Sequence, residues 1–189
     1  LNHKIGSSTM KQLLTFIFLT VALYANSGGP GQGYANNAPN LNNFTSCHNG
    51  TQNSGDGSVF FTGLPNSYVP GETYTIGVTV TGANERGFGF QAAVQSGNDV
   101  AGEILLNSSS SNAEINGDYI QHSSRTTSGS WVFDWIAPST DLGEVTFSVS
   151  GLATGGSSST GGDDVYTASE IIPSQIPLDV SGLLFSEYG

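Results

Sequence analysis

Alternation of apolar with small or polar residues is the feature that most restricts what this chain can fold into. An apolar residue stands at every second position of Tyr74–Val80, Phe88–Val94, Trp131–Trp135 and Val145–Val149. Successive side chains of a β-strand point to opposite faces, so this period of two predicts strands with one face in a core. Turn-rich stretches separate these segments, and no helical period accompanies them. The pattern predicts an all-β, antiparallel β-sandwich of about seven to nine strands.

Composition and charge narrow the class of partner. Only 10% of the 189 residues are charged, and 15 acidic residues against 4 basic ones give a formal net charge of -11. Such a surface repels the phosphates of nucleic acids and of anionic lipids. We therefore expect no nucleic-acid partner, and no membrane contact through a basic patch. The many Gly, Ser, Thr and Asn residues are typical of a secreted all-β protein.

The amino-terminal segment predicts export. Residues 10–25 contain Lys11, then the apolar run Leu13–Leu23, and end at the small residue Ala25. This order is that of a secretory signal peptide, and the run is shorter than the roughly 20 residues that span a bilayer. We expect cleavage near Ala25, no membrane span in the mature chain, and a location outside the cell or on its outer surface. Residues 1–9 would then be upstream residues without a structural role.

The mature chain divides into three parts. Residues 26–51 form a Gly- and Asn-rich arm without a regular element, and residues 52–170 hold the sandwich domain. Residues 171–189 form a carboxy-terminal extension. The chain starts with Leu1 rather than Met, so we expect it to be a fragment that stops before a sorting or anchor signal.

Five short motifs in a fixed order give the chain a family resemblance. They are Asn37-Ala38-Pro39 with Phe44–His48, Gly87–Gln91, Tyr119–His122, Trp131–Pro138 and Gly162–Tyr166. In this order they resemble the bacterial choice-of-anchor V domain, a relative of the Reeler domain of animal extracellular proteins. The resemblance covers about residues 27 to 168. It implies an immunoglobulin-like sandwich that is exported, in Bacteroidota-type bacteria often ahead of a sorting or anchoring signal.

Cys47 and His48 are the first candidate for a site. The resemblance aligns them with a Cys-x-x-Cys-His element, the attachment motif of c-type haem, in which two thiols bond the porphyrin and the histidine binds iron. Phe44 stands where the first thiol would be. Haem attachment through Cys47 alone is one interpretation, and a degenerate motif with a structural role is the other. As the only cysteine, Cys47 forms no disulfide within the chain. One Cys and two mature His residues do not supply the four ligands of a closed zinc site without carboxylates.

Asp163 and Asp164 are the candidate metal ligands. They follow Gly161-Gly162 at the entry of a predicted strand. Carboxylate and backbone oxygens are the ligands that calcium prefers. Adjacent aspartates at a turn are also commonly solvated, so calcium binding and a plain turn both stay open.

His122 and Asp134 are interpreted as structural. His122 and Ser123 are neighbours on a predicted strand, point to opposite faces and therefore do not form a base and a nucleophile. We expect a partly buried His122 bonded to backbone. Asp134 should point away from the core and pair with Arg125 across a hairpin.

Three functions follow from these observations. The leading hypothesis is a non-catalytic secreted or cell-surface module that binds an extracellular protein or glycan, in adhesion, matrix assembly or ligand binding. The first alternative is a haem-bearing electron-transfer accessory domain using Cys47 and His48. The second is a secreted hydrolase, although no pair of catalytic residues is evident. We expect no enzyme activity and no cofactor unless haem or calcium binds at the residues above. The sequence assigns neither the ligand nor the oligomeric state.

Overall fold

The computed structural model describes residues 28–83, 86–155 and 162–175. The predicted upstream residues and signal peptide, and the extension from residue 176 onward, lie outside the described residues. Within them, a short 3-10 helix precedes ten strands. They are η1 (Phe44–Ser46), β1 (Ser58–Thr62), β2 (Thr73–Thr81), β3 (Gly87–Ser96), β4 (Asp99–Val100), β5 (Glu103–Leu106), β6 (Ala113–Asn116), β7 (Tyr119–His122), β8 (Ser130–Ile136), β9 (Val145–Thr154) and β10 (Asp164–Ile172).

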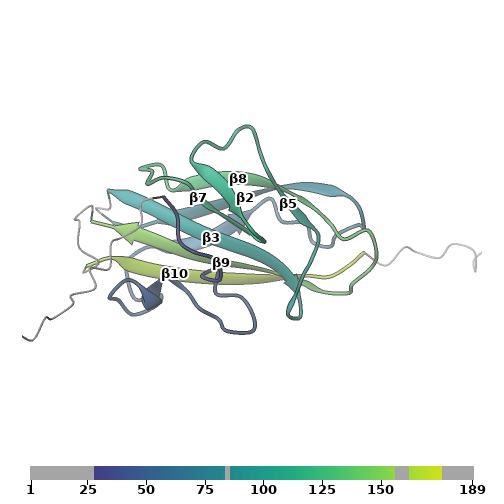
Figure 1. The fold of residues 1–189 in the computed structure, drawn as a ribbon, viewed down its shortest axis with the longest axis horizontal. Coiled ribbons are helices and arrows are strands. Elements are labelled where there is room, and N and C mark those ends of the chain that lie inside the picture. The colour runs from purple at the N-terminus through teal and green to yellow at the C-terminus, as the bar shows by residue number, and fades with distance from the viewer. Residues whose placement is uncertain (1–27, 84–85, 156–161, 176–189) are drawn as a thin grey trace, which may run out of the picture.

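The strands form two antiparallel sheets packed face to face (Figure 1). One sheet has the order β1-β2-β8-β5, and the other has the order β10-β9-β3-β7-β6, with β4 paired to β3. This arrangement confirms the predicted antiparallel β-sandwich. The described residues hold ten strands where seven to nine were expected, and the difference comes from short strands such as β4, which has two residues.

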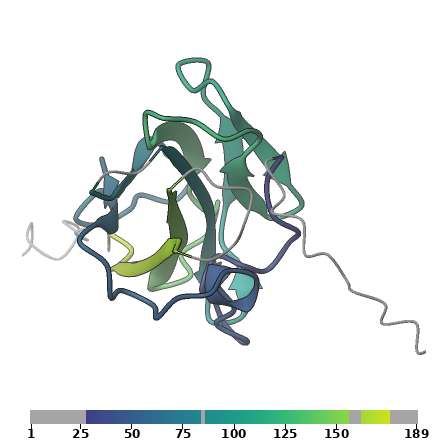
Figure 2. The ribbon, with the colours of Figure 1, turned by 90° about the vertical axis from the view of Figure 1, so that its left-hand side faces the viewer.

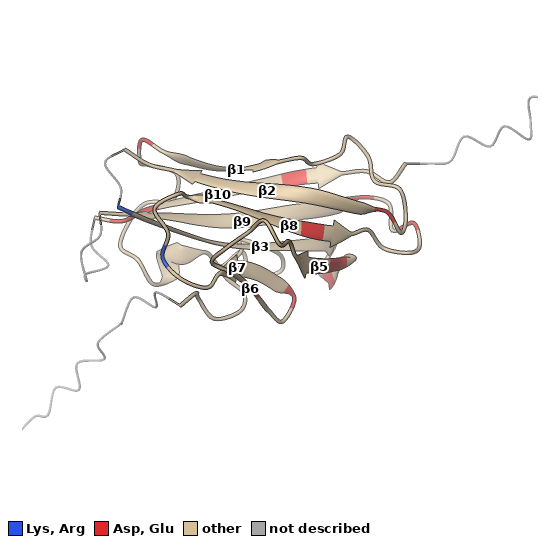
Figure 3. Cartoon of the chain, turned by 90° about the horizontal axis from the view of Figure 1, so that it is seen from above, with Lys and Arg blue, Asp and Glu red and all other residues tan. Residues whose placement is uncertain are grey.

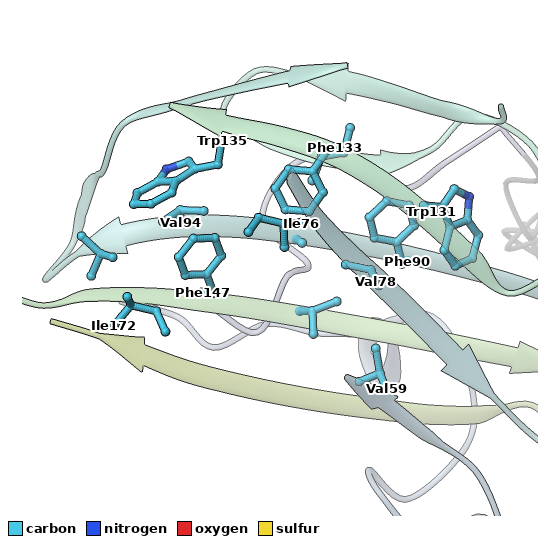
Figure 4. Close-up of a cluster of buried hydrophobic side chains, with 14 of the residues drawn as sticks. Val59, Ile76, Val78, Phe90, Val94, Trp131, Phe133, Trp135, Phe147 and Ile172 are labelled. Atoms are coloured by element: carbon cyan, nitrogen blue, oxygen red, sulfur yellow. The ribbon is translucent and has the colours of Figure 1, made fainter. Parts of the chain in front are cut away.

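Aromatic side chains fill the space between the sheets (Figure 4). Along β8, Trp131, Phe133 and Trp135 are buried while the residues between them are partly exposed, as the alternation predicts. The ring of Trp135 meets Phe147 of β9 edge to face, with centroids 4.9 Å apart. The ring of Phe90 lies 4.4 Å from that of Trp131. Residues from both sheets therefore build one core.

The central strands β3 and β9 are buried on both faces, although alternation predicts only one buried face. Their outward side chains include the polar Gln91, Ser148 and Ser150, which are 0%, 4% and 0% exposed. Residues 28–57 lie over this face and shield it from water. They include the described part of the predicted arm and the residues that lead to β1, and the whole segment is called the arm from here on. Figure 1 shows the arm in purple in front of β3 and β9, and Figure 2 shows it outside the strands.

Hydrogen bonds fix the arm to the sheet. The Gln91 side chain accepts a bond from the Tyr34 backbone N–H at 2.6 Å. Its amide nitrogen donates to the Gly31 carbonyl at 2.8 Å and to the Gln121 side chain at 2.7 Å. The Phe44 N–H donates to Ser150 Oγ at 3.3 Å. The arm is irregular apart from η1 and packs as a third layer of the same folded unit.

Asp134 points away from the core, but its expected pairing with Arg125 is wrong. Its carboxylate accepts hydrogen bonds from Thr75 Oγ1 at 2.7 Å and from Asn107 Nδ2 at 2.9 Å. The side chain of Arg125 lies against Gly87 instead. The partners of Asp134 come from β2 and from the turn after β5, because these strands flank β8 in the sheet.

No helix among the described residues has the length and hydropathy that crossing a membrane requires.

Truncation of the central ring should show how much stability the core contributes. Phe147 is fully buried, so Phe147→Ala removes its ring contacts and leaves a cavity. We expect a loss of about 3 to 5 kcal/mol in the free energy of unfolding, measured by urea denaturation. Phe60→Ala is the matched control, because Phe60 is 42% exposed and its loss should cost less than about 1 kcal/mol. Equal losses would contradict the assignment of the core.

Candidate functional site

Cys47 and His48 lie where the arm meets the start of β10. The turn that carries them follows η1, whose first turn is capped by Asn43. The Asn43 Oδ1 atom accepts a hydrogen bond from the Thr45 N–H at 2.9 Å, as an N-cap side chain does. Asn43 itself is 6% exposed. The cap therefore holds this turn against the sheet.

His48 and Asp163 form a close pair. His48 Nδ1 lies 2.7 Å from Asp163 Oδ2, and the two side chains are 11% and 4% exposed. A buried carboxylate without a partner would be costly, and the imidazole provides one. The pair therefore anchors the arm, through His48, to Asp163, the residue that precedes β10.

Cys47 is exposed, and its side chain interacts with that of Tyr34. The charge that Cys47 carries when ionised raises the pKa of Tyr34, and burial and a hydrogen bond with Cys47 raise it further. Both residues belong to the arm. The contact thus joins two parts of the same segment at the surface.

Phe44, in the position of the missing first thiol, belongs to the interior. It is 4% exposed and packs with Leu152 and Val165 in a small apolar cluster. Its ring also meets the His48 ring edge to face, with centroids 6.5 Å apart. These apolar groups pack against one another. Haem attachment at Cys47 and His48 stays a prediction, and these contacts favour the structural interpretation of the motif.

Asp163 and Asp164 engage different neighbours. Asp163 is paired with His48, while the carboxylate of Asp164 lies against Gly55 of the arm. Within residues 28–83, 86–155 and 162–175, no group of three or more His, Cys, Asp or Glu side chains could hold a metal ion together. Calcium binding at the two aspartates stays a prediction. The contact with His48 gives the buried carboxylate of Asp163 a hydrogen-bond partner.

His122 is buried and bonded to backbone, as expected. Its Nδ1 atom lies 3.0 Å from both the N–H nitrogen and the carbonyl oxygen of Phe90. The ring covers Gly89, where a Cβ atom would stand 2.7 Å from His122 Cε1. β7 ends at His122, and the His122 imidazole bonds to the Phe90 backbone in place of a backbone group of β7. This is a structural role, and no hydroxyl or thiol is bonded to the ring in the part of the chain that the structure describes.

A groove between the edge strands β1 and β10 is a feature that the sequence did not indicate. It has a volume of about 390 Å³, and its lining includes Phe61, Leu64, Pro65, Glu170 and Ile171. It combines apolar side chains with a carboxylate at its rim. No local signal could reveal it, because it forms where two strands distant in the sequence become the edges of different sheets.

Acidification should destabilise the fold through His122. Burial lowers the pKa of His122, and the charge of His48 lowers it further, although the Phe90 carbonyl and Glu114 oppose the shift. The unfolded chain takes up this proton near pH 6.5 and the folded chain does not, so stability is lost as the pH falls below about 6.5. The loss continues down to the lowered pKa of the folded state.

The test is to measure urea unfolding across this pH range for the wild type and for His122→Asn. Asparagine keeps a polar group near Phe90 and does not titrate. We expect a shallower slope in the variant, the difference reaching at most about 1.4 kcal/mol per pH unit. Identical slopes would show that other groups cause the pH dependence.

Haem attachment can be tested by intact mass after export from a bacterium with cytochrome-maturation machinery. We expect the mass of the chain without an added group, because Phe44 and its neighbours are packed. A haem-sized increment that disappears in Cys47→Ala would contradict this expectation and establish a haem protein.

Two solved structures are distantly similar to this chain. The human F-spondin reeler domain (fragment 1) is 20% identical, with a TM-score of 0.49, over 67% of this chain and 94% of that chain. A conjugative transposon lipoprotein from Bacteroides eggerthii is 12% identical, with a TM-score of 0.40, over 61% and 95%. No curated protein matches the chain.

The family is shown by a sequence model rather than by these distant structures. The model of the Reeler domain matches residues 40–154, which is more than half of the chain. The match begins inside the arm and includes Cys47 and His48, so residues 40–57 of the arm belong to the matched region. The narrower resemblance to the choice-of-anchor V domain stays a prediction. The chain belongs to the Reeler domain family.

Proposed function

We propose that this protein is a secreted or cell-surface module that binds an extracellular protein or glycan and catalyses no reaction. Membership of the Reeler family supports an extracellular binding role. The chemically active side chains support it too, because His48 is paired with Asp163 and His122 is bonded to Phe90. These groups stabilise the fold. A hydrolase would need such groups free to meet a substrate.

The observation that carries the proposal is the groove between β1 and β10. Ligand sites are typically concave and offer a few polar groups to the ligand. The accessible surface of this groove is mostly polar, with Glu170 as its charged group and Phe61, Leu64 and Ile171 among its apolar lining residues. Ile171 is 59% exposed, so its side chain is accessible to a partner in the groove.

The charge of the chain restricts the partner. Arg86 and Arg125 are the only basic residues besides histidine after the predicted cleavage near Ala25. A partner rich in phosphate or sulfate would therefore be repelled. Neutral glycans and proteins with cationic or apolar surfaces remain compatible.

The experiment is to measure binding of the purified, exported protein to the washed surface of cells that produce it. We expect saturable binding that Ile171→Glu weakens at least about tenfold, because a buried carboxylate in the groove is costly. Ile115→Glu is the matched control, since Ile115 is 40% exposed on β6, at the opposite edge of the same sheet. Absence of export, or binding that neither substitution changes, would contradict the proposal.

A further inference from the structure

The chain itself bounds the groove between β1 and β10 at both ends. On the edge of β10, the Asn53 N–H donates to the Val165 carbonyl and Asn53 Oδ1 accepts from the Thr167 N–H, both at 2.8 Å. Past the end of β10, the Tyr68 N–H donates to the Pro173 carbonyl at 2.9 Å. Only the stretch between these contacts is open. The groove therefore has room for a compact ligand and not for an extended chain along β10.

Free backbone groups of β10 lie along this open stretch. In an antiparallel strand the N–H and C=O of one residue point to the same side, and every second residue points to that side. Val165, Thr167 and Pro173 use the side away from β9, so the groups of Ser169 and Ile171 point there as well. No described residue is hydrogen-bonded to them. They offer a ligand both N–H donors and carbonyl acceptors.

Glu170 stands on the face of β10 that is turned toward the other sheet. Ala168 and Ile172, two positions to either side, pack with the core, and residues two apart in a strand share a face. Glu170 also lines the groove. Among the described residues its carboxylate forms no ion pair, and both described arginines lie at the opposite end of the sandwich (Figure 3). The fold thus leaves this carboxylate available to a ligand.

The opposite wall combines an aromatic ring with neutral polar groups. The ring of Phe61 meets that of Phe147 edge to face, with centroids 5.8 Å apart, so it lies on the core side of β1. The lining residues Thr62, Leu64 and Asn66 add a hydroxyl, an apolar side chain and an amide. The volume of about 390 Å³ falls within the range of small-ligand sites, roughly 300 to 1,000 Å³.

We propose that this groove binds a small neutral carbohydrate, either free or as the end of a larger glycan. The inference rests on the proposed binding function and names the chemical class of its ligand. A sugar hydroxyl both donates and accepts hydrogen bonds. The Glu170 carboxylate and the carbonyls of Ser169 and Ile171 accept from such hydroxyls, and the N–H groups of Ser169 and Ile171 donate to them. Phe61 and Leu64 contact the apolar C–H face of the sugar ring.

The polar groups of the groove favour a neutral ligand over a charged one. A phosphate or sulfate group would meet Glu170 with no basic side chain in the lining to offset the repulsion. An ammonium group would pair with Glu170, but it accepts no hydrogen bond and would leave the N–H groups of Ser169 and Ile171 unpaired beneath it. Covering a donor without giving it an acceptor is costly. A ring with several hydroxyls satisfies donors and acceptors together.

The experiment is a titration of the full, nitrogen-15-labelled chain, followed by the NMR shifts of its backbone amides. The probes are the methyl glycosides of glucose, galactose, mannose and N-acetylglucosamine, with glucosamine and glucose 6-phosphate as charged comparisons. We expect saturable shifts of the Ser169 and Ile171 amides with at least one neutral glycoside, with a dissociation constant of about 1 mM for a ligand of this size. The charged sugars should bind at least about tenfold more weakly.

A substitution at Glu170 tests the carboxylate. An inward-pointing charge on an edge strand also prevents the strand from pairing with a second copy, which would be a structural role. Glu170→Ala should weaken binding of the neutral glycoside about tenfold, because it removes a charged hydrogen-bond acceptor. Asp118→Ala removes the same charge from the exposed turn after β6 and should leave binding within about twofold.

Several outcomes would overturn the inference. They are no saturable shift with any neutral glycoside, shifts confined to amides away from the groove, and equal effects of Glu170→Ala and Asp118→Ala. Glucosamine binding as tightly as the neutral glycosides would make a cation the ligand instead. If the protein still binds the washed cell surface and no neutral glycoside competes, the carbohydrate inference fails while the proposed function stands. If surface binding is absent as well, both fail.

Discussion

The Gln91 amide is the interaction on which much of this structure depends. It lies in the middle of β3 on the outward face of the larger sheet, and it is fully buried. A buried amide must have its hydrogen bonds satisfied, and the partners come from Gly31, Tyr34 and Gln121. The sheet therefore requires the arm, and the arm lacks a regular structure of its own. This mutual dependence explains why Cys47 and His48, on the same arm, occupy a fixed place.

The alternation in the sequence was sufficient to predict the strands and the core. Trp131, Phe133 and Trp135 are buried as the period of two requires. It was not sufficient to predict the third layer, because Gly- and Asn-rich segments look alike whether they are solvated or packed. It also misassigned the partner of Asp134, since cross-strand neighbours depend on the order of strands in a sheet.

The motif around Cys47 was visible in the sequence, and its contacts were not. The spacing of Cys47 and His48 indicates haem chemistry, but only the folded chain brings Asp163 to His48 and Leu152 to Phe44. The groove escaped prediction for a related reason. Nothing local marks β1 and β10 as edges, and their proximity follows from the way the two sheets stack. The proposed binding groove thus depends on topology more than on any short motif.

The covered sheet has a practical consequence for where this domain can be cut. A fragment that begins at residue 52, the predicted start of the sandwich domain, would lack Tyr34 and Phe44. It would leave Ser150 without the Phe44 N–H and Gln91 without its bonds to Tyr34 and Gly31, and it would expose the apolar face of Leu152. Such a fragment would expose apolar side chains and unpaired polar groups on the outward face of the sheet, and it would tend to aggregate. A fragment for expression therefore has to include Gly31 and Tyr34, which bond to Gln91.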